Sequence, residues 1–141
     1  MKKLLILAVT VIFSISGKSQ SDTQDIKDVE AICNYYLDGA TNGDSIMFSK
    51  AFLPDGQMRY MRNDTVMNVS LKDFMARARN NGTKQSRKTK IENIQVFGNA
   101  ATAKLTIEYP TFYFHDFMSL LKTKDGWKIV GKIFYREEKA K

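Results

Sequence analysis

Two adjacent titratable residues, His115 and Asp116, lie in the otherwise largely apolar segment Phe112 to Leu121. A carboxylate among apolar side chains has a raised pKa and can act as a general acid or base near neutral pH. The imidazole, the only one in the chain, can play the same part. Adjacent residues of a strand point to opposite faces, so the two cannot work as a pair and only one faces the interior.

The turn before the last strand decides which of the two faces inward. If Asp125-Gly126 forms a two-residue turn, Asp116 lies opposite Tyr135 on the inner face. A three-residue loop shifts the register by one and puts His115 in that place. We favour the shorter turn, so Asp116 is the candidate catalytic residue and His115 the alternative. A structural alternative is that Asp116 only accepts hydrogen bonds within the fold or faces solvent.

Aromatic side chains recur on the faces expected to point inward. They predict a cavity for a small apolar or aromatic ligand, with a tyrosine available to polarise it. The same rings could equally fill the core. The candidate ligand-binding residues are Tyr36, Phe52, Tyr60, Phe74, Tyr109, Phe112, Phe114 and Tyr135.

The elements that position these residues follow from apolar spacing. Helical periodicity predicts helices over residues 26–40, 44–52 and 70–78, the last two capped by Asp44 and Ser70. Turn residues and alternation predict strands. In the last strand, the apolar side runs through Trp127 and Tyr135. The expected strands are residues 57–61, 65–69, 88–97, 100–109, 112–122 and 127–136.

The first nineteen residues differ from the rest of the chain. Lys2 and Lys3 precede an apolar run from Leu4 to Ile15, the pattern of a secretory signal peptide with cleavage after Ser19. The run is shorter than the roughly 20 residues that span a bilayer, so no stable membrane anchor is expected. We therefore expect one exported domain, residues 20–141, in the periplasm or secreted. Cleavage lowers the formal net charge from +7 to +4 by removing three lysines.

Other chemistry has little support in the sequence. A single cysteine, Cys33, cannot form an internal disulfide and is expected to be a buried thiol. One histidine without clustered carboxylates predicts no metal site, and the absence of a phosphate-binding glycine loop predicts no cofactor. The basic stretch from Arg77 to Lys90 lacks the interleaved aromatics of a nucleic-acid interface, so we expect no nucleic-acid partner.

Two segments carry a family resemblance. The first segment runs from Tyr36-Leu37-Asp38-Gly39 through Asn42-Gly43-Asp44 to Phe52-Leu53-Pro54-Asp55. The second runs from Asp116 to Lys122 and continues through Asp125 to Val130. They resemble the nuclear transport factor 2-like (SnoaL-like) superfamily, and within it the branch described as "putative lumazine-binding". The resemblance implies an α+β fold, a cone-shaped barrel with three N-terminal helices on a strongly curved mixed or antiparallel sheet.

Because this superfamily holds both enzymes and binders, the resemblance leaves function open. We expect an exported, non-catalytic small-molecule-binding domain. The alternatives are a cofactor-independent isomerase or dehydratase with Asp116 as base, and an interaction domain without a ligand. The resemblance also implies a homodimer through the outer sheet face, with a seam formed by Tyr113, Phe117, Val130 and Phe134.

Overall fold

The structure, a computed structural model, describes residues 18–140, so nearly all of the predicted signal peptide lies outside the described residues. The elements follow the order α1 (Lys18–Asn42), α2 (Ser45–Ser49), β1 (Phe52–Arg62), β2 (Thr65–Ser70), α3 (Leu71–Ala76), β3 (Lys88–Phe97), β4 (Ala100–Glu108), β5 (Phe112–Thr123) and β6 (Gly126–Glu138). The α+β class is therefore confirmed. Within this part of the chain, no helix is both long and apolar enough to cross a membrane.

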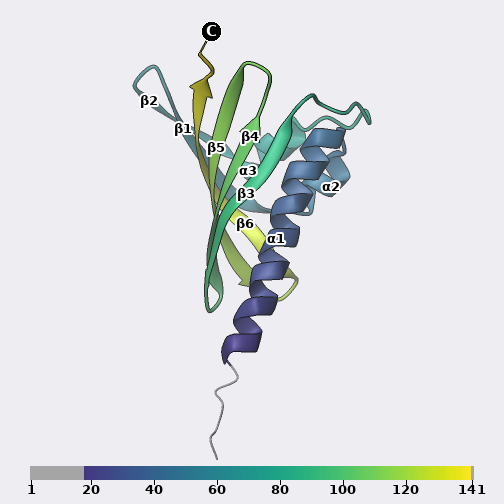
Figure 1. Ribbon diagram of the computed structural model, residues 1–141, viewed down its shortest axis with the longest axis vertical. Coiled ribbons are helices and arrows are strands. Elements are labelled where there is room, and N and C mark those ends of the chain that lie inside the picture. The colour runs from purple at the N-terminus through teal and green to yellow at the C-terminus, as the bar shows by residue number, and fades with distance from the viewer. Residues whose placement is uncertain (1–17, 141) are drawn as a thin grey trace, which may run out of the picture.

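The six strands form one mixed sheet in the order β2-β1-β6-β5-β4-β3. All neighbouring strands run antiparallel except β1 and β6, which are parallel. The long helix α1 lies along one face of this curved sheet, and α2 and α3 lie near its C-terminal end (Figure 1). The core fills the space between α1 and the sheet.

Both predicted N-caps are present. The Asp44 side chain accepts a hydrogen bond from the Met47 amide at 2.8 Å, and Ser70 Oγ accepts one from the Asp73 amide at 3.0 Å. The first strand is longer than expected: β1 begins at Phe52 and runs through Pro54 to Gly56, whereas we predicted a strand that starts at residue 57. This prediction was wrong because the register between β1 and β6 is interrupted between Phe52 and Gln57, which accommodates the irregular residues.

A buried polar contact fixes the N-terminal half of α1 to the sheet. The carboxylate of Asp25 accepts a hydrogen bond from Trp127 Nε1 at 3.0 Å and forms an ion pair with Lys122 Nζ at 2.6 Å. Both partners flank the β5–β6 turn. Trp127 is buried in the core, so its indole N–H needs an acceptor there and Asp25 supplies it.

The C-terminal end of α1 is held by the segment between α3 and β3. Arg87 donates to the Leu37 carbonyl, to Thr41 Oγ1 and to Tyr109 Oη, at 2.8 to 2.9 Å. Gln85 donates to the carbonyls of Ala40 and Thr41. Arg87 is therefore anchored on α1, and Gln85 beside it satisfies two carbonyls that a helix end leaves without partners.

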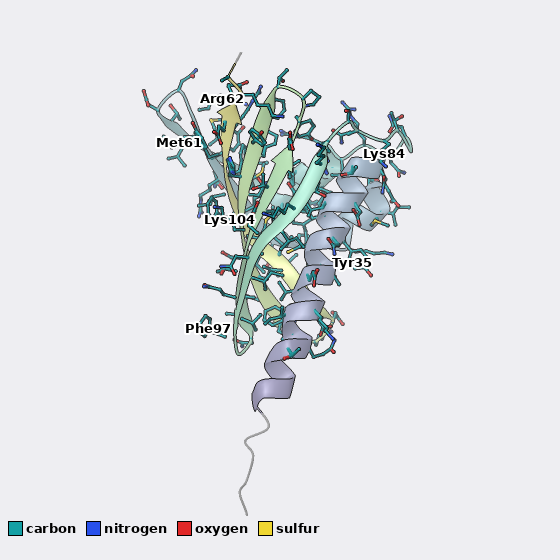
Figure 2. The ribbon with its side chains drawn as sticks, viewed as in Figure 1. Tyr35, Met61, Arg62, Lys84, Phe97 and Lys104 are labelled. Atoms are coloured by element: carbon teal, nitrogen blue, oxygen red, sulfur yellow. The ribbon has the colours of Figure 1, made fainter. Side chains whose placement is uncertain are left out.

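Figure 2 shows how the exposed side chains are distributed over these elements. Tyr35 lies on the side of α1 turned away from the sheet, and Phe97 lies at the tip of the β3–β4 hairpin. Met61 and Arg62 mark the β1–β2 tip at the opposite end of the sheet, and Lys84 lies in the segment that holds α1.

Candidate functional site

Three polar side chains meet in the interior between α1 and the sheet. Tyr36 Oη donates a hydrogen bond to Asp116 Oδ2 at 2.6 Å, and Lys132 Nζ donates to Tyr36 Oη at 2.8 Å. Lys132 also forms an ion pair with Asp116 Oδ2. Asp116 is 0% exposed and Lys132 6% exposed. This buried triad is a closed hydrogen-bonded unit with a compensated charge.

Each member of the triad comes from a different element. Tyr36 lies on the buried stripe of α1 with Val29, Cys33 and Leu37. Asp116 faces inward from β5, where Met118 and Leu120 on the same side are also buried. The expected inward direction of Asp116 is confirmed, whereas a functional role for it stays a prediction.

Lys132 reaches the interior because β6 contains a β-bulge. Ser119 pairs with Gly131 and Leu120 pairs with Ile129, which leaves Val130 as an extra residue. Before the bulge Trp127 and Ile129 are buried, and after it Lys132 is the buried residue. An extra residue reverses which side chains face the core.

The bulge overturns two of our predictions. The loop before β6 does have two residues, but they are Lys124 and Asp125, and Lys122 pairs with Trp127. Asp116 therefore lies opposite Phe134 instead of Tyr135, and it is His115 that pairs with Tyr135. Tyr135 is 65% exposed on the outer side, so it cannot line an interior site.

His115, the alternative catalytic residue, lies on the outer side of the sheet. Its Nε2 lies 2.6 Å from Glu137 Oε2, and Nδ1 lies 3.5 Å from Thr106 Oγ1. The structure thus separates it from the triad, although the register did shift relative to our favoured pairing. Asp116 faces inward with Met118 and Leu120 because the alternation of β5 is uninterrupted, and the bulge of β6 changes only the residues that lie opposite.

Burial determines the protonation behaviour of the triad. It lowers the pKa of the Lys132 ammonium, and the neighbouring Asp116 carboxylate acts in the opposite direction. Burial, reinforced by the Asp116 charge, raises the pKa of the Tyr36 phenol well above its ordinary range. Tyr36 therefore remains a neutral hydrogen-bond donor to Asp116 at physiological pH.

One polar atom of the triad is left over. Asp116 Oδ1 is buried and has no hydrogen-bond partner among the described residues. Buried polar atoms almost always have a partner, so a free carboxylate oxygen requires an explanation.

Three rings surround the Lys132 ammonium. Its Nζ lies 4.9 Å from the ring centroid of Tyr36, 5.1 Å from that of Phe134 and 5.8 Å from that of Phe74.

A row of aromatic rings crosses β1, β6 and β5 on the inner face, beside the triad, and ends at the residue that follows β4. Tyr60 of β1 stacks on Phe134 of β6 at 4.8 Å, and Phe134 meets Phe114 of β5 edge-on at 5.3 Å. Phe114 in turn meets Tyr109 after β4 at 6.0 Å, and Tyr109 stacks on Phe112. All five rings, which we call the aromatic row, are only partly buried.

The remaining predicted ligand-binding residues lie in the core. Phe52 is buried in a ring cluster with Phe48 and Tyr36, with centroid distances of 5.0 and 5.6 Å. Phe74 packs edge-on against Phe52, and its ring centroid lies 5.8 Å from Lys132 Nζ. These rings position Tyr36, whereas the aromatic row is the part of the inner face that is incompletely covered.

Sequence reasoning missed Lys132 and misplaced Phe134. Strict alternation from Trp127 put both on the outer face, and Phe134 was assigned to a dimer seam. Phe134 instead stacks on Tyr60 in the interior. The signal for the bulge was Gly131, because a glycine inside a strand often marks one. Within residues 18–140, no group of three or more metal-ligating side chains occurs.

A groove of about 680 Å³ lies on the opposite, outer face of the sheet. Its polar lining includes Arg59, Lys104 and Ser119, and its apolar lining includes Phe117 and Ile133. Phe117 and Ile133 are exposed there. This groove is separate from the aromatic row because the two lie on opposite faces of the same strands.

The family described as "putative lumazine-binding" has a model that matches residues 24–135. The chain belongs to this family. The matched range contains the triad and all of the aromatic row. Curated proteins gave no match.

The chain shares its fold with solved structures described as nuclear transport factor 2-like. A protein of unknown function from Shewanella baltica is 24% identical, with a TM-score of 0.72 over 82% of this chain and 95% of that one. One from Methylobacillus flagellatus is 28% identical, with a TM-score of 0.70 over 81% and 93%. A ketosteroid isomerase-like protein from Erwinia carotovora atroseptica is 12% identical, with a TM-score of 0.63 over 80% and 96%. The first and last of these likenesses concern the fold alone.

Proposed function

We propose that this protein is an exported domain that binds a small, planar, largely apolar ligand and does not transform it. The observation that carries the proposal is the aromatic row. Its five rings come from three neighbouring strands and the residue that follows β4, and each leaves part of its surface uncovered. Partly uncovered aromatic faces are well suited to stacking against another ring.

The triad supports binding rather than catalysis. A general base must reach a substrate proton, but Asp116 Oδ2 is already occupied by Lys132 and Tyr36. Using that oxygen as a base requires breaking a buried ion pair. The carboxylate serves better as a fixed polar group at the edge of an apolar site.

The alternative is a cofactor-independent isomerase or dehydratase in which Asp116 is the general base. The unpartnered Oδ1 favours it, because that oxygen retains its lone pairs for a substrate. Under this alternative, Asp116→Asn abolishes turnover of a carbonyl substrate that the wild-type protein converts. If a ligand binds and mass spectrometry detects no product of it after a day of incubation with the protein, the result supports the non-catalytic proposal.

The family description suggests the first ligand to test, the pteridine lumazine. Isothermal titration of the mature protein should show saturable binding, and Tyr60→Ala and Phe134→Ala should each weaken it at least tenfold. Phe97→Ala is the matched control, since Phe97 is 79% exposed at the distant β3–β4 tip. The proposal is wrong if no member of a panel of planar heterocycles binds, or if the row variants bind like the control.

Export is part of the proposal and is supported by the basic start and the apolar run from Leu4 to Ile15. Cleavage after Ser19 leaves Gln20 as the first residue, two positions into α1. Expression of the full chain in a bacterial host, followed by fractionation and N-terminal sequencing, tests this. Recovery of the uncut chain in the cytoplasm counts against it.

We also propose that two copies pair through the outer face of the sheet. Exposed Phe117 and Ile133 beside the outer groove support this, and Phe134 no longer belongs to the seam. Light scattering on the mature protein should give twice the mass of one chain. The double variant Phe117→Lys, Ile133→Lys should give the mass of a single chain. A wild-type monomer at millimolar concentration would end this part of the proposal.

A further inference from the structure

The unpartnered oxygen of Asp116 identifies a polar contact that the proposed ligand needs. In an ionised carboxylate both oxygens accept hydrogen bonds and neither donates. Lys132 and Tyr36 both donate to Oδ2, Lys132 donates also to Tyr36 Oη, and neither donates to Oδ1. The ammonium keeps the interior charge compensated while one oxygen remains available as an acceptor.

Asp116 also lies next to the aromatic row. Phe114 is two residues before it on the same face of β5, and Phe134 is its direct partner on β6. Residues at such positions are about 5 to 7 Å apart. A ring stacked on Phe114 or Phe134 therefore lies beside the carboxylate, and because Asp116 is fully buried, a neighbouring side chain must move aside before the ring edge reaches Oδ1.

We propose that Asp116 Oδ1 is the acceptor that selects the ligand. The inference rests on the proposed binding function and names the class of ligand. The site takes a neutral planar heterocycle with a ring N–H, of the lactam or imide kind. It rejects rings that present only a carbonyl or a carboxylate at that edge, because two acceptors cannot form a hydrogen bond and two negative charges repel each other.

A ligand-side comparison tests the inference without altering the protein. Lumazine carries two ring N–H groups, and 1,3-dimethyllumazine has methyl groups in their place with the same fused rings. Titration of both into the mature wild-type protein should give at least a tenfold weaker affinity for the dimethyl compound. This is the loss expected when a hydrogen bond to a charged acceptor is removed.

The outcomes separate this inference from the proposed function. Equal affinities for both compounds overturn the inference, because a buried water then accounts for Oδ1, and leave the binding function intact. If neither compound nor any other planar heterocycle binds, the inference and the binding function both fall. A tenfold or greater preference for lumazine supports both.

A protein-side experiment assigns the preference to Asp116. The triple variant Tyr36→Phe, Asp116→Leu, Lys132→Met replaces the whole triad with apolar groups of similar size and leaves no unpaired charge. Once circular dichroism shows that it is folded, its affinities for lumazine and 1,3-dimethyllumazine should differ by less than twofold. Phe97→Ala should keep the wild-type preference. A triple variant that retains the full preference overturns the assignment.

Discussion

Gly56 of β1 lies directly against the main-chain carbonyl of Val130, the extra residue in the bulge of β6. A Cβ atom at position 56 would overlap that carbonyl oxygen and would also press on a methyl group of Leu71. The irregularity of β1 and the bulge of β6 are therefore packed against each other. Through this contact, a glycine on one strand permits the geometry that turns Lys132 inward on another.

We expect Gly56→Ala to destabilise the protein by about 1–3 kcal/mol, the usual effect of forcing an extra methyl group into a well-packed region. The reason is contact with backbone, which cannot rotate away. Urea denaturation followed by tryptophan fluorescence measures it, using the single Trp127. Gly98→Ala is the control for steric overlap, because no atom lies within 4 Å of a Cβ atom built at Gly98. The positive φ of Gly98 adds backbone strain in that variant. A Gly56→Ala variant as stable as the wild type would show that the two strands are not coupled here.

Removing the positive charge of the triad should be costly. Lys132→Met leaves Asp116 buried without its counter-charge, for which we expect a loss of about 3–5 kcal/mol in the free energy of unfolding. The triple variant Tyr36→Phe, Asp116→Leu, Lys132→Met should recover most of that loss, since no uncompensated polar group remains. Lys104→Met, at an exposed position beside the outer groove, should change stability little. A tolerated Lys132→Met would contradict the ion pair.

The acid stability of the protein should depend on Asp25. Hydrogen bonds from Lys122 and Trp127 hold the pKa of this carboxyl below its ordinary value of 3.8. A group with a lowered folded-state pKa stabilises the fold above its unfolded-state pKa, and loses that effect as the pH falls through the folded value. Between pH 7 and pH 2, the melting temperature of the wild type should therefore fall more steeply below pH 4 than that of Asp25→Asn.

The matched control for this pH profile is Asp38→Asn, at an exposed position on the same helix. It should follow the wild-type curve throughout. Parallel curves for the wild type and Asp25→Asn below pH 4 would show that the contact between α1 and the β5–β6 turn does not survive in solution.

Much of this fold could be predicted from the sequence because local signals are strong. The caps at Asp44 and Ser70, the stripe on α1 and the inward direction of Asp116 all follow from residue spacing. Lys132 could not be predicted in this way, since alternation is counted from a starting residue and the bulge at Val130 resets the count. The pairing of Asp116 with Phe134 depends on that bulge and on a turn one residue earlier than expected.

Cys33 should be chemically silent in the folded protein. Burial, with a smaller effect from Glu30, raises the pKa of its thiol to about 12, so almost no thiolate exists at pH 8. An aromatic disulfide reagent should release no colour from the native protein and one equivalent after denaturation in guanidinium chloride. Rapid reaction without denaturant would mean that α1 separates readily from the sheet.

The fastening of the segment before β3 has a consequence for how a ligand reaches the inner face. This segment has little regular structure, yet Gly82 bonds to Gly43, and Gln85 and Arg87 bond to the last turns of α1. A stretch anchored at several points does not swing open as a flap. Admission to the interior then depends on single side chains turning about their own bonds. A site of this kind opens by side-chain rotation and needs no rearrangement of the main chain.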